Sequence, residues 1–505
     1  MTSHSIYTVE ASSAGSGADL SARGERGRED DGELLRPFDF HQMDSIINAR
    51  SLAVVGASNS PAKFGYYYTR SQLEMDFAGD VFLVNPNEDE VFGVRAYPDL
   101  LSLPSRPDLV YLAIPAHLSI DVLRDCAAVG VRCVMMIASG FREIGEDGLR
   151  LEREALRIAR RGGFRILGPN CFGIYNPRTR LTMLPGPDFS RVPGDVAFIS
   201  QSGGFSAHIA RMGKGLGVGF SAVVSYGNAA DLDEIDLLRY FTRDPATAVI
   251  SCYIEGTSSG QRFFKAVRAA ARVKPVVVWK SGRGASAGRA VQTHTGSLAG
   301  SPVIWDSLLR QCGVITTSGI DGLCDVLLAL KHMGRRPGRR VLICGGGGAL
   351  GTSGADIAEE SGLEVPALET GAGARLREVL DRAGTVVANP LDIGSPLIPP
   401  ALFERTIDEA SRNATTDVLV FDLAVNFAHL LYGADSIERS VDSLLGARAR
   451  SGKPVAAVLY SRACGEDDLH YEGVLRSMRT RLHRGGVPVF PSMERALAAI
   501  ARVNE

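Results

Sequence analysis

The sequence lacks long apolar segments, clustered cysteines and an excess of charge of one sign. No apolar run reaches the roughly 18 residues that a membrane-spanning helix needs, so we expect no membrane contact. The eight cysteines are scattered and no pair has C-x-x-C spacing, which argues against a metal site or a disulfide framework and favours reduced thiols in the cytoplasm. A formal net charge of −2 argues against a broad nucleic-acid-binding face.

The composition is that of an ordinary globular protein, with 45% hydrophobic and 22% charged residues. A chain of 505 residues is long enough for about three domains. The first part differs from the rest, because residues 1–41 are rich in Ser, Gly, Asp, Glu and Arg and contain no apolar signal core. We therefore predict a disordered tail over residues 1–41.

Strand-like apolar runs alternate with helical patterns along the remainder of the chain. This alternation predicts an α/β fold of parallel sheets flanked by helices. The pattern restarts twice, which divides the chain into three blocks at residues 42–182, 190–332 and 338–505. Each block opens with a strand, a turn of small residues and a helix, an arrangement that directs backbone N–H groups and a helix dipole toward an anion. Three such turns suggest phosphate handling, although internal duplication of one fold would give the same pattern.

The first block departs from the dinucleotide-binding fingerprint in two places. Ser58 stands where the second glycine is expected, and the second strand ends in Asn85-Pro86-Asn87 without the acidic residue that holds a ribose. Both departures disfavour an NAD(P)-dependent oxidoreductase. Another nucleotide-bearing ligand fits better, with Ser58, Asn59 and Lys63 available to its phosphates. The alternative is a strand–turn–helix unit with a purely structural role.

His294 is the candidate nucleophile of the second block. It lies in a run of small residues, 293–300, after the strand-like run 275–280. A neutral imidazole is a good nucleophile and can carry a covalent group. A single histidine in a glycine-rich loop is more often an exposed residue with no role, so the assignment depends on the other motifs of the chain.

Several short motifs in a fixed order resemble those of the NDP-forming acyl-CoA synthetases, relatives of the succinyl-CoA synthetase α subunit. The resemblance covers about residues 45–500 and is specific because of the order and spacing of the motifs. The motifs are Gly56-Ala57-Ser58, Val84-Asn85-Pro86, Ser139-Gly140-Phe141-Arg142-Glu143, the run 167–173, Ser200-Gln201-Ser202-Gly203-Gly204, the run 225–231, Tyr253-Ile254-Glu255-Gly256, Lys280-Ser281-Gly282-Arg283, His294-Thr295-Gly296 and Asn389-Pro390-Leu391-Asp392.

The resemblance implies a Rossmann-like CoA-binding domain followed by two flavodoxin-like, succinyl-CoA synthetase-like domains. It implies an acid–CoA ligase that works through an acyl phosphate and a phosphohistidine at His294, with Glu255 hydrogen-bonding the histidine. The residues expected to bind coenzyme A are Gly56, Ser58, Asn59, Lys63, Asn85, Pro86, Pro115 and Asn170. The residues expected to bind phosphate are Ser202, Gly203, Gly204, Gly296, Gly346, Gly347 and Gly348. Cys171 and His208 are interpreted as packed, structural residues.

Two features depart from the family, and one of its domains has no counterpart in the three blocks. Asn87 stands where the family usually has lysine, and the glycine run 345–348 is one residue longer than the family pattern. No block fits the ATP-grasp domain that binds ATP or ADP with Mg²⁺ in the family. We therefore expect a separate ATP-grasp β-type subunit, a hetero-oligomer, and a small carboxylic acid as substrate. The alternative is a non-catalytic CoA-binding regulatory protein of the same fold.

Overall fold

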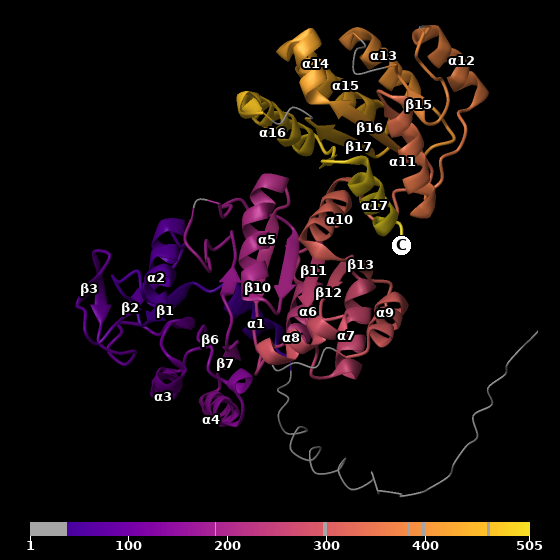
Figure 1. The fold of residues 1–505 in the computed structure, drawn as a ribbon. Coiled ribbons are helices and arrows are strands. Elements are labelled where there is room, and N and C mark those ends of the chain that lie inside the picture. Colours follow the sequence, from indigo (N-terminus) through magenta and orange to yellow (C-terminus); the bar gives the residue numbers. More distant parts are fainter. Residues whose placement is uncertain (1–37, 187, 296–299, 382, 395–398, 462–464) are drawn as a thin grey trace, which may run out of the picture. The chain divides into compact units, whose positions relative to one another are not determined.

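The computed structural model describes residues 38–186, 188–295, 300–381, 383–394, 399–461 and 465–505 (Figure 1). The chain divides into two units, Met1–Phe40 and His41–Glu505. The predicted tail at residues 1–41 lies almost wholly outside the described residues. Its last two residues, however, belong to helix α1 (Phe40–Ile47). Met43, Ile46 and Ile47 are buried on one face of this helix, so apolar residues at helical spacing begin the folded part earlier than the tail boundary implied.

The first sheet has seven strands in the order β3-β4-β2-β1-β5-β6-β7. All pairs are parallel except the β3–β4 hairpin. The strands are β1 (Ser51–Val55), β2 (Asp80–Val84), β3 (Glu90–Val91), β4 (Val94–Tyr97), β5 (Leu109–Leu112), β6 (Cys133–Met136) and β7 (Arg165–Leu167). The helices are α2 (Phe64–Met75), η1 (Ala116–Leu118), α3 (Ser119–Val129), η2 (Arg142–Ile144) and α4 (Glu146–Gly162).

The second sheet has six strands in the order β13-β12-β11-β9-β10-β8. Its strands are β8 (Gly173–Tyr175), β9 (Val196–Ser200), β10 (Phe220–Ser225), β11 (Val249–Ile254), β12 (Val276–Lys280) and β13 (Ile315–Thr317). Its helices are α5 (Gly203–Leu216), α6 (Glu234–Arg243), α7 (Gly260–Ala271), α8 (Ala285–Thr295), α9 (Pro302–Gln311) and α10 (Gly319–Met333). Strand β8 is antiparallel to β10 and belongs to this sheet. The chain therefore enters the second sheet before residue 182, where we had drawn the domain boundary.

The third sheet has five parallel strands in the order β15-β14-β16-β17-β18. Its strands are β14 (Val341–Gly345), β15 (Leu391–Asp392), β16 (Val418–Ala424), β17 (Val455–Tyr460) and β18 (Val489–Phe490). Its helices are α11 (Gly348–Glu360), α12 (Thr370–Val379), α13 (Pro400–Ser411), α14 (Val425–Tyr432), α15 (Ala434–Ser451), η3 (Glu466–Asp468), α16 (Leu469–Arg484) and α17 (Met493–Val503).

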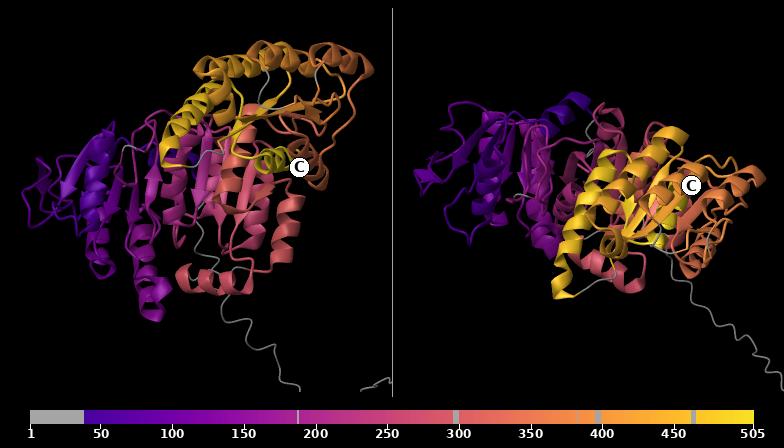
Figure 2. Two further views of the ribbon diagram at one scale, coloured as in Figure 1. Left: turned by 45° about the horizontal axis from the view of Figure 1, so that its top comes forward. Right: turned by 90° about the horizontal axis from the view of Figure 1, so that it is seen from above.

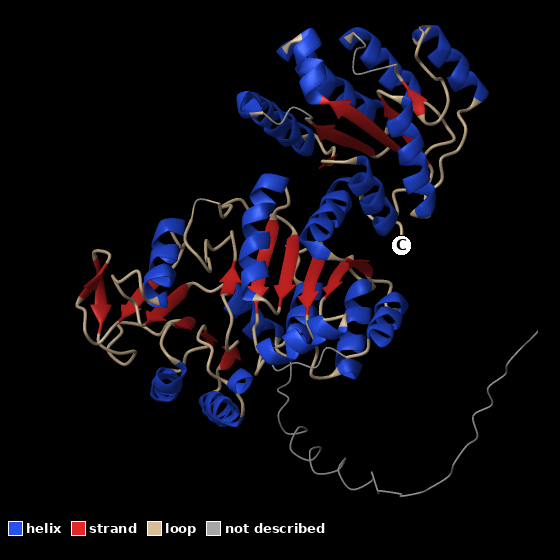
Figure 3. Ribbon diagram, viewed as in Figure 1, coloured by secondary structure: helices blue, strands red, loops and turns tan. Residues whose placement is uncertain are grey.

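Helices cover both faces of these sheets (Figures 2 and 3). On the third sheet, α13 packs against α15 while α11 packs against α17. The central strands β5, β9 and β16 are buried at every position, which explains why they read as continuous apolar runs rather than alternating ones. The predicted α/β class with mostly parallel sheets is confirmed. No helix within the described ranges is both long and apolar enough to cross a bilayer.

The predicted turns and site residues lie where the parallel strands end. Residues that follow the carboxyl ends of neighbouring strands meet at one edge of a sheet, the usual ligand-binding edge of open α/β sheets. In the first sheet this edge carries Gly56 and Asn85, and in the second it carries Gln201 and Glu255.

Candidate active site

The turn after β1 brings the start of α2 very close to the end of the strand. Gly56 has φ +88°, and a Cβ at this position would lie 2.7 Å from Ile114 Cγ2, so only glycine fits. A Cβ at Gly65 would overlap the carbonyl oxygen of Gly56. Gly65, which sequence reasoning did not single out, thus allows the close helix–strand approach that the third glycine of a dinucleotide fingerprint provides.

The carboxylate of Glu88 holds the polar side chains of this turn together. Ser58 Oγ donates to Glu88 Oε1 at 3.2 Å, and Asn59 Nδ2 donates to Oε2 at 2.7 Å. Asn85 Nδ2 donates to Oε1 at 3.1 Å and to the Ala57 carbonyl at 2.7 Å. Three predicted CoA-binding residues are therefore adjacent.

The tip of the second strand, Asn85-Pro86-Asn87, contains no acidic residue, as the sequence indicated, but a carboxylate reaches the turn from the next position. Glu88 follows Asn87 directly in the sequence, and its side chain folds back onto the turn. The identity of the residue was visible, but the direction of the loop was not.

The other predicted CoA-binding residues do not join this group. Lys63 is exposed at the position before α2, without a side-chain capping bond. Pro86 and Pro115 are exposed at the ends of β2 and β5. Asn170 lies between β7 and β8, where its Nδ2 donates to Asn228 Oδ1 at 3.4 Å. Asn170 therefore belongs to a second polar cluster, at the junction of the first and second sheets.

Glu143 lies at the centre of that second cluster. Its Oε2 accepts from Asn228 Nδ2 at 2.6 Å, and its Oε1 accepts from the Gly140 and Phe141 N–H groups at 2.6 and 3.2 Å. Burial raises the pKa of Glu143, but these hydrogen bonds outweigh that effect and the net pKa lies below its ordinary value. Helix α8 contacts η2, the short helix that contains Glu143. Glu143 and Asn228 lie within quoted motifs but were not named as site residues.

Glu255 lies just beyond β11 with one carboxylate oxygen unsatisfied. Its side chain is buried, and Tyr253 donates from its hydroxyl to Oε1 at 3.3 Å. Oε2 is buried and has no hydrogen-bond partner in the described part of the chain. Gln201 Oε1 accepts from the N–H groups of Glu255 and Gly256 at 2.9 and 3.1 Å, and so fixes the loop. A buried, unpaired carboxylate oxygen is available to accept a hydrogen bond from a further group.

The same glutamine connects Glu255 to the start of α5. Ser202 follows Gln201 and caps the helix, because its Oγ accepts from the Phe205 N–H at 3.3 Å. A Cβ at Gly203 would lie 2.8 Å from the Phe172 ring, whereas one at Gly204 would contact only Ser202 Oγ at 3.9 Å. N–H groups in the first turn of a helix have no intrahelical acceptor. The first turn of α5 therefore presents donors beside Glu255.

The structure places His294 differently from the sequence prediction. We predicted a glycine-rich loop, but α8 continues through Thr295, so His294 lies in the last turn of that helix. The helix continues because residues 285–291 include several alanines, which favour helix strongly. The side chain of His294 and the predicted phosphate ligand Gly296 lie outside the described residues.

Of the two residues interpreted as packed, Cys171 is buried and His208 is not. Cys171 is fully buried, and burial raises the pKa of its thiol to about 12, so it stays protonated and inert. His208 is exposed on α5, so the interpretation that it is packed was wrong. Its neighbours at helical spacing did not reveal which face of α5 is turned to solvent.

Lys280 adds a buried cation beside Glu255. Its Nζ donates to the Glu255 carbonyl at 2.7 Å and to the Ser281 carbonyl, and lies 5.0 Å from the centroid of the Trp305 ring. Burial lowers the pKa of Lys280 to about 8, although the charge of Glu255 opposes the shift. Lys280 thus joins the ends of β11 and β12 and places positive charge near the unpaired carboxylate.

In the turn after β14, one backbone N–H group already donates a hydrogen bond to a carboxylate. The Gly347 N–H donates to Asp392 Oδ1 at 3.1 Å, and the Gly394 N–H donates to the same oxygen at 2.9 Å. A Cβ at Gly345 would lie 2.9 Å from Asp422 Cβ. Of the predicted phosphate ligands Gly346, Gly347 and Gly348, Gly347 therefore has its donor engaged.

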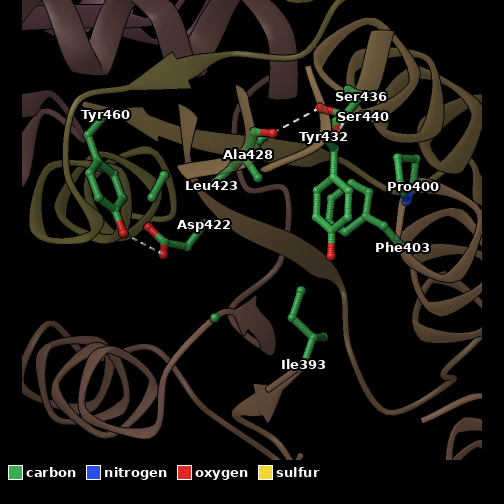
Figure 4. A pocket seen from close by; sticks show the side chains of 12 residues that line it. Ile393, Pro400, Phe403, Asp422, Leu423, Ala428, Tyr432, Ser436, Ser440 and Tyr460 are labelled. Atoms are coloured by element: carbon green, nitrogen blue, oxygen red, sulfur yellow. Dashed lines mark hydrogen bonds between the residues drawn. The ribbon is translucent and has the colours of Figure 1, made fainter. Parts of the chain in front are cut away.

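A small cavity of about 30 Å³ lies beside Gly346 (Figure 4). A cavity of this size has room for a water molecule or a group of similar size. Asp422 forms its polar end, where Tyr460 donates from its hydroxyl to Oδ2 at 3.1 Å. The remaining lining is mainly apolar and consists of Ile393, Pro400, Phe403, Leu423, Ala424, Ala428, Tyr432, Ser436 and Ser440.

Family models match the first two sheets. Residues 50–177 match a CoA-binding domain, and residues 193–330 match a succinyl-CoA ligase-like flavodoxin domain. These ranges contain the Glu88 turn and the Glu255 loop respectively.

Curated relatives and a solved structure match most of the chain. The α subunit of ADP-forming acetate–CoA ligase II from Pyrococcus furiosus is 34% identical over 465 residues, which are 90% of this chain and 96% of that one. The ADP-forming acetate–CoA ligase I of Archaeoglobus fulgidus is 34% identical over 91% of this chain, but the match spans only 63% of the relative.

A similar fold is seen in the dinucleotide-forming acetyl-coenzyme A synthetase 1 of Ca. Korarchaeum cryptofilum, whose structure contains phosphate and ADP. It has a TM-score of 0.79 and 29% identity, and the match covers 91% of this chain and 96% of that one. The Glu255 loop and the glycine-containing turns after β1 and β9 lie within the matched ranges. The chain belongs to the family of ADP-forming acid–CoA ligases, the NDP-forming acyl-CoA synthetases.

Proposed function

We propose that this chain is the α-type component of an acid–CoA ligase and that His294 carries the phosphoryl group. The observation that carries the proposal is the buried Oε2 of Glu255, which has no partner among the described residues and lies beside the first turn of α5. A carboxylate that accepts a hydrogen bond from one imidazole nitrogen fixes the tautomer and leaves the other nitrogen nucleophilic. The N–H groups of α5 would stabilise the negative charge of the phosphoryl group.

The chemistry has three steps in the direction of acyl-CoA cleavage. A phosphate oxygen attacks the thioester carbonyl and the carbon–sulfur bond breaks, giving an acyl phosphate and free CoA. An imidazole nitrogen of His294 then attacks phosphorus, and the acid leaves as a carboxylate. Finally a terminal oxygen of ADP attacks the same phosphorus and breaks the phosphorus–nitrogen bond, giving ATP. Each step needs positioning and charge stabilisation more than further covalent catalysis.

Coenzyme A is assigned to the first sheet. The start of α2 supplies backbone donors for a pyrophosphate. The side chains of Ser58, Asn59 and Asn85 lie next to it and are held in place by Glu88. The second polar cluster, formed by Asn170, Asn228 and Glu143, lies where α8 contacts η2. We assign the thiol end of coenzyme A to this cluster, because α8 also carries His294.

ATP or ADP with Mg²⁺ is assigned to a separate ATP-grasp β-type subunit in a hetero-oligomer. The similarity to a relative named as an α subunit, which this chain covers almost completely, supports that assignment. The longer Archaeoglobus relative is consistent with a further component on one chain. The substrate is a small carboxylic acid, and the cytoplasm is the proposed compartment.

The test is transfer of label from ATP to the chain. The chain is mixed with an ATP-grasp partner encoded beside it, magnesium and ATP labelled in the γ-phosphate. We expect an acid-labile, base-stable label on the wild type and none on His294→Ala, with His208→Ala as the matched control because that histidine is exposed. Equal labelling of wild type and His294→Ala would remove His294 as the carrier. Absence of label on every variant would favour a non-catalytic CoA-binding regulator.

A further inference from the structure

Lys280 is a buried cation that holds the backbone of the Glu255 loop. It is 5% exposed at the end of β12, and its Nζ donates to the Glu255 carbonyl at 2.7 Å and to the Ser281 carbonyl. Gln201 holds the other peptide group of Glu255, because its Oε1 accepts from the Glu255 N–H at 2.9 Å. Side chains at the ends of the two strands that flank β11 therefore fix the backbone on both sides of the carboxylate.

The ring of Trp305 lies over the same ammonium group. Lys280 Nζ is 5.0 Å from the ring centroid, which is within the range of a cation–π interaction. Trp305 is buried on α9, and a Cβ at Gly300 would lie 3.0 Å from its Nε1. The backbone six residues after His294 therefore packs against the ring that covers Lys280.

The charged groups around Lys280 act in opposite directions. Of the described groups, Glu255 beyond β11 favours the ammonium form, whereas Arg283 on the loop after β12 opposes it. Arg283 is itself paired with Asp306 on α9, at 2.5 and 2.7 Å. Burial outweighs the favourable charge of Glu255, so the pKa of Lys280 lies at about 8. Lys280 is therefore charged at neutral pH and loses its charge within the range in which an enzyme is readily assayed.

A second lysine of the same sheet shows a purely structural role. Lys274 precedes β12, and its Nζ donates to the Phe241 and Asp244 carbonyls, both at 2.6 Å, at the carboxyl end of α6. A cation at the carboxyl end of a helix meets the negative end of the helix dipole. Lys280 instead donates to loop carbonyls at the other end of β12, and Glu255 is the described carboxylate that acts on it. The charge of Lys280 is thus tied to Glu255 and not to a helix end.

We propose that Lys280 is a positioning residue for phosphoryl transfer, which in its ammonium form holds the Glu255 loop and offsets the negative charge that gathers there when His294 is phosphorylated. The inference rests on the proposed function, because it concerns how Glu255 serves His294. Transfer beside a carboxylate brings two negative groups together, and a fixed cation reduces their repulsion. Loss of the Lys280 proton should therefore slow the transfer as pH rises through about 8.

The first measurement follows the protonation of Lys280 through the fluorescence of Trp305. The chain contains two tryptophans, so a Trp279→Phe background leaves Trp305 alone. We expect the emission of the full-length chain to titrate with a midpoint at about pH 8, and Lys280→Met to abolish this titration. Lys274→Met is the matched control and should leave the titration unchanged, because that lysine donates to carbonyls at the start of the strand.

The second measurement is the initial rate of His294 labelling between about pH 7 and about pH 9.5, with the ATP-grasp partner, magnesium and ATP labelled in the γ-phosphate. Lys274→Met is assayed in parallel, so that the pH dependence of the partner cancels in the ratio of rates. We expect Lys280→Met to be about tenfold slower than this control at the lower pH and within about twofold of it at the higher pH. Lys280→Arg stays charged throughout and should lose the alkaline fall in rate.

Three results would overturn the inference and leave the proposed function intact. They are equal rates for Lys280→Met and Lys274→Met at the lower pH, a constant ratio of these rates at every pH, and an alkaline fall in Lys280→Arg equal to that of the wild type. A fluorescence titration that survives in Lys280→Met would overturn it as well. If Lys280→Met does not fold, the pH profile of Lys280→Arg decides. Absence of label on the wild type would overturn the proposed function, and the inference with it.

Discussion

The turns after β9 and β14 have the same local plan but different electrostatic surroundings. Both follow a buried strand, contain glycines and open a helix, α5 or α11. Beside the first, Glu255 approaches with one carboxylate oxygen unpaired and leaves the N–H groups of Gly203 and Gly204 to other acceptors. At the second, Asp392 accepts the Gly347 N–H itself. The two turns therefore differ in whether a neighbouring carboxylate already accepts one of their backbone donors.

The turn after β1 is an intermediate case. Glu88 leaves the backbone of the turn alone but accepts from the side chains of Ser58 and Asn59. In each sheet the carboxylate next to the turn comes from a different strand than the one that leads into the turn. Glu88 follows β2, Glu255 follows β11, and Asp392 lies in β15. The local sequence motif thus determines the backbone of the turn, whereas a residue at the end of the neighbouring strand determines the charge beside it.

The comparison of the turns after β9 and β14 predicts its largest effect for Glu255→Gln, which changes the carboxylate beside the turn after β9. The amide retains the size of the side chain but cannot supply the negative acceptor that orients a histidine. We expect the rate of His294 phosphorylation to fall by about 10²-fold or more, as measured by rapid-quench labelling with the ATP-grasp partner. An unchanged rate would show that the unpaired oxygen has no part in the transfer.

A second test concerns the packing of the turn after β9. Gly203→Ala places a Cβ 2.8 Å from the Phe172 ring, so either the helix start or the ring must move. We expect a loss of about 1–3 kcal/mol in the free energy of unfolding, measured by urea denaturation. Gly204→Ala is the matched control, because its Cβ meets nothing closer than 3.9 Å. Equal destabilisation by both substitutions would contradict the argument from Phe172.

The loop that carries Glu255 should also depend on pH through Glu234. Thr257 donates from Oγ1 to Glu234 Oε1 at 2.6 Å, so α6 holds this loop. Burial, with the charge of Asp233 adding to it, raises the pKa of Glu234 from 4.5 to about 7. The native state thus binds a proton that the unfolded state has released between these pH values. Stability from this group is present below pH 4.5 and is lost as pH rises through about 7.

Glu234→Gln removes this titration. Relative to the variant, the wild type should lose stability between pH 5 and pH 8, which thermal unfolding at the two pH values measures. A pH-independent difference in melting temperature would mean that Glu234 does not change its protonation over this range.

The smallest expected effect is at the turn after β14. Asp392→Asn keeps an oxygen that can accept from Gly347 but removes the negative charge beside the helix start. We expect the KM for inorganic phosphate to fall by about two- to fivefold, the size of a screened charge effect. A rise in KM would indicate that Asp392 supports phosphate binding through the geometry of the turn instead of opposing it.

The sequence alone predicted the fold class, the family and the strand–turn–helix plan of all three sheets. Those properties depend on apolar runs, small-residue turns and short motifs, each of which is encoded within a few consecutive residues. The sequence did not reveal that β8 joins the second sheet, that α8 extends through His294 or that His208 is exposed. These outcomes depend on how far a helix continues and which face meets solvent, which local patterns constrain weakly.

Only the tertiary structure decided which charged and polar groups meet at the ends of the strands. Ser58 and Glu88 are 30 residues apart, Gln201 and Glu255 are 54 apart, and Gly347 and Asp392 are 45 apart. Strand order and the direction of each loop bring these pairs within hydrogen-bond distance. Neither property is a function of local sequence, because a parallel sheet joins segments whose connecting helices separate them along the chain.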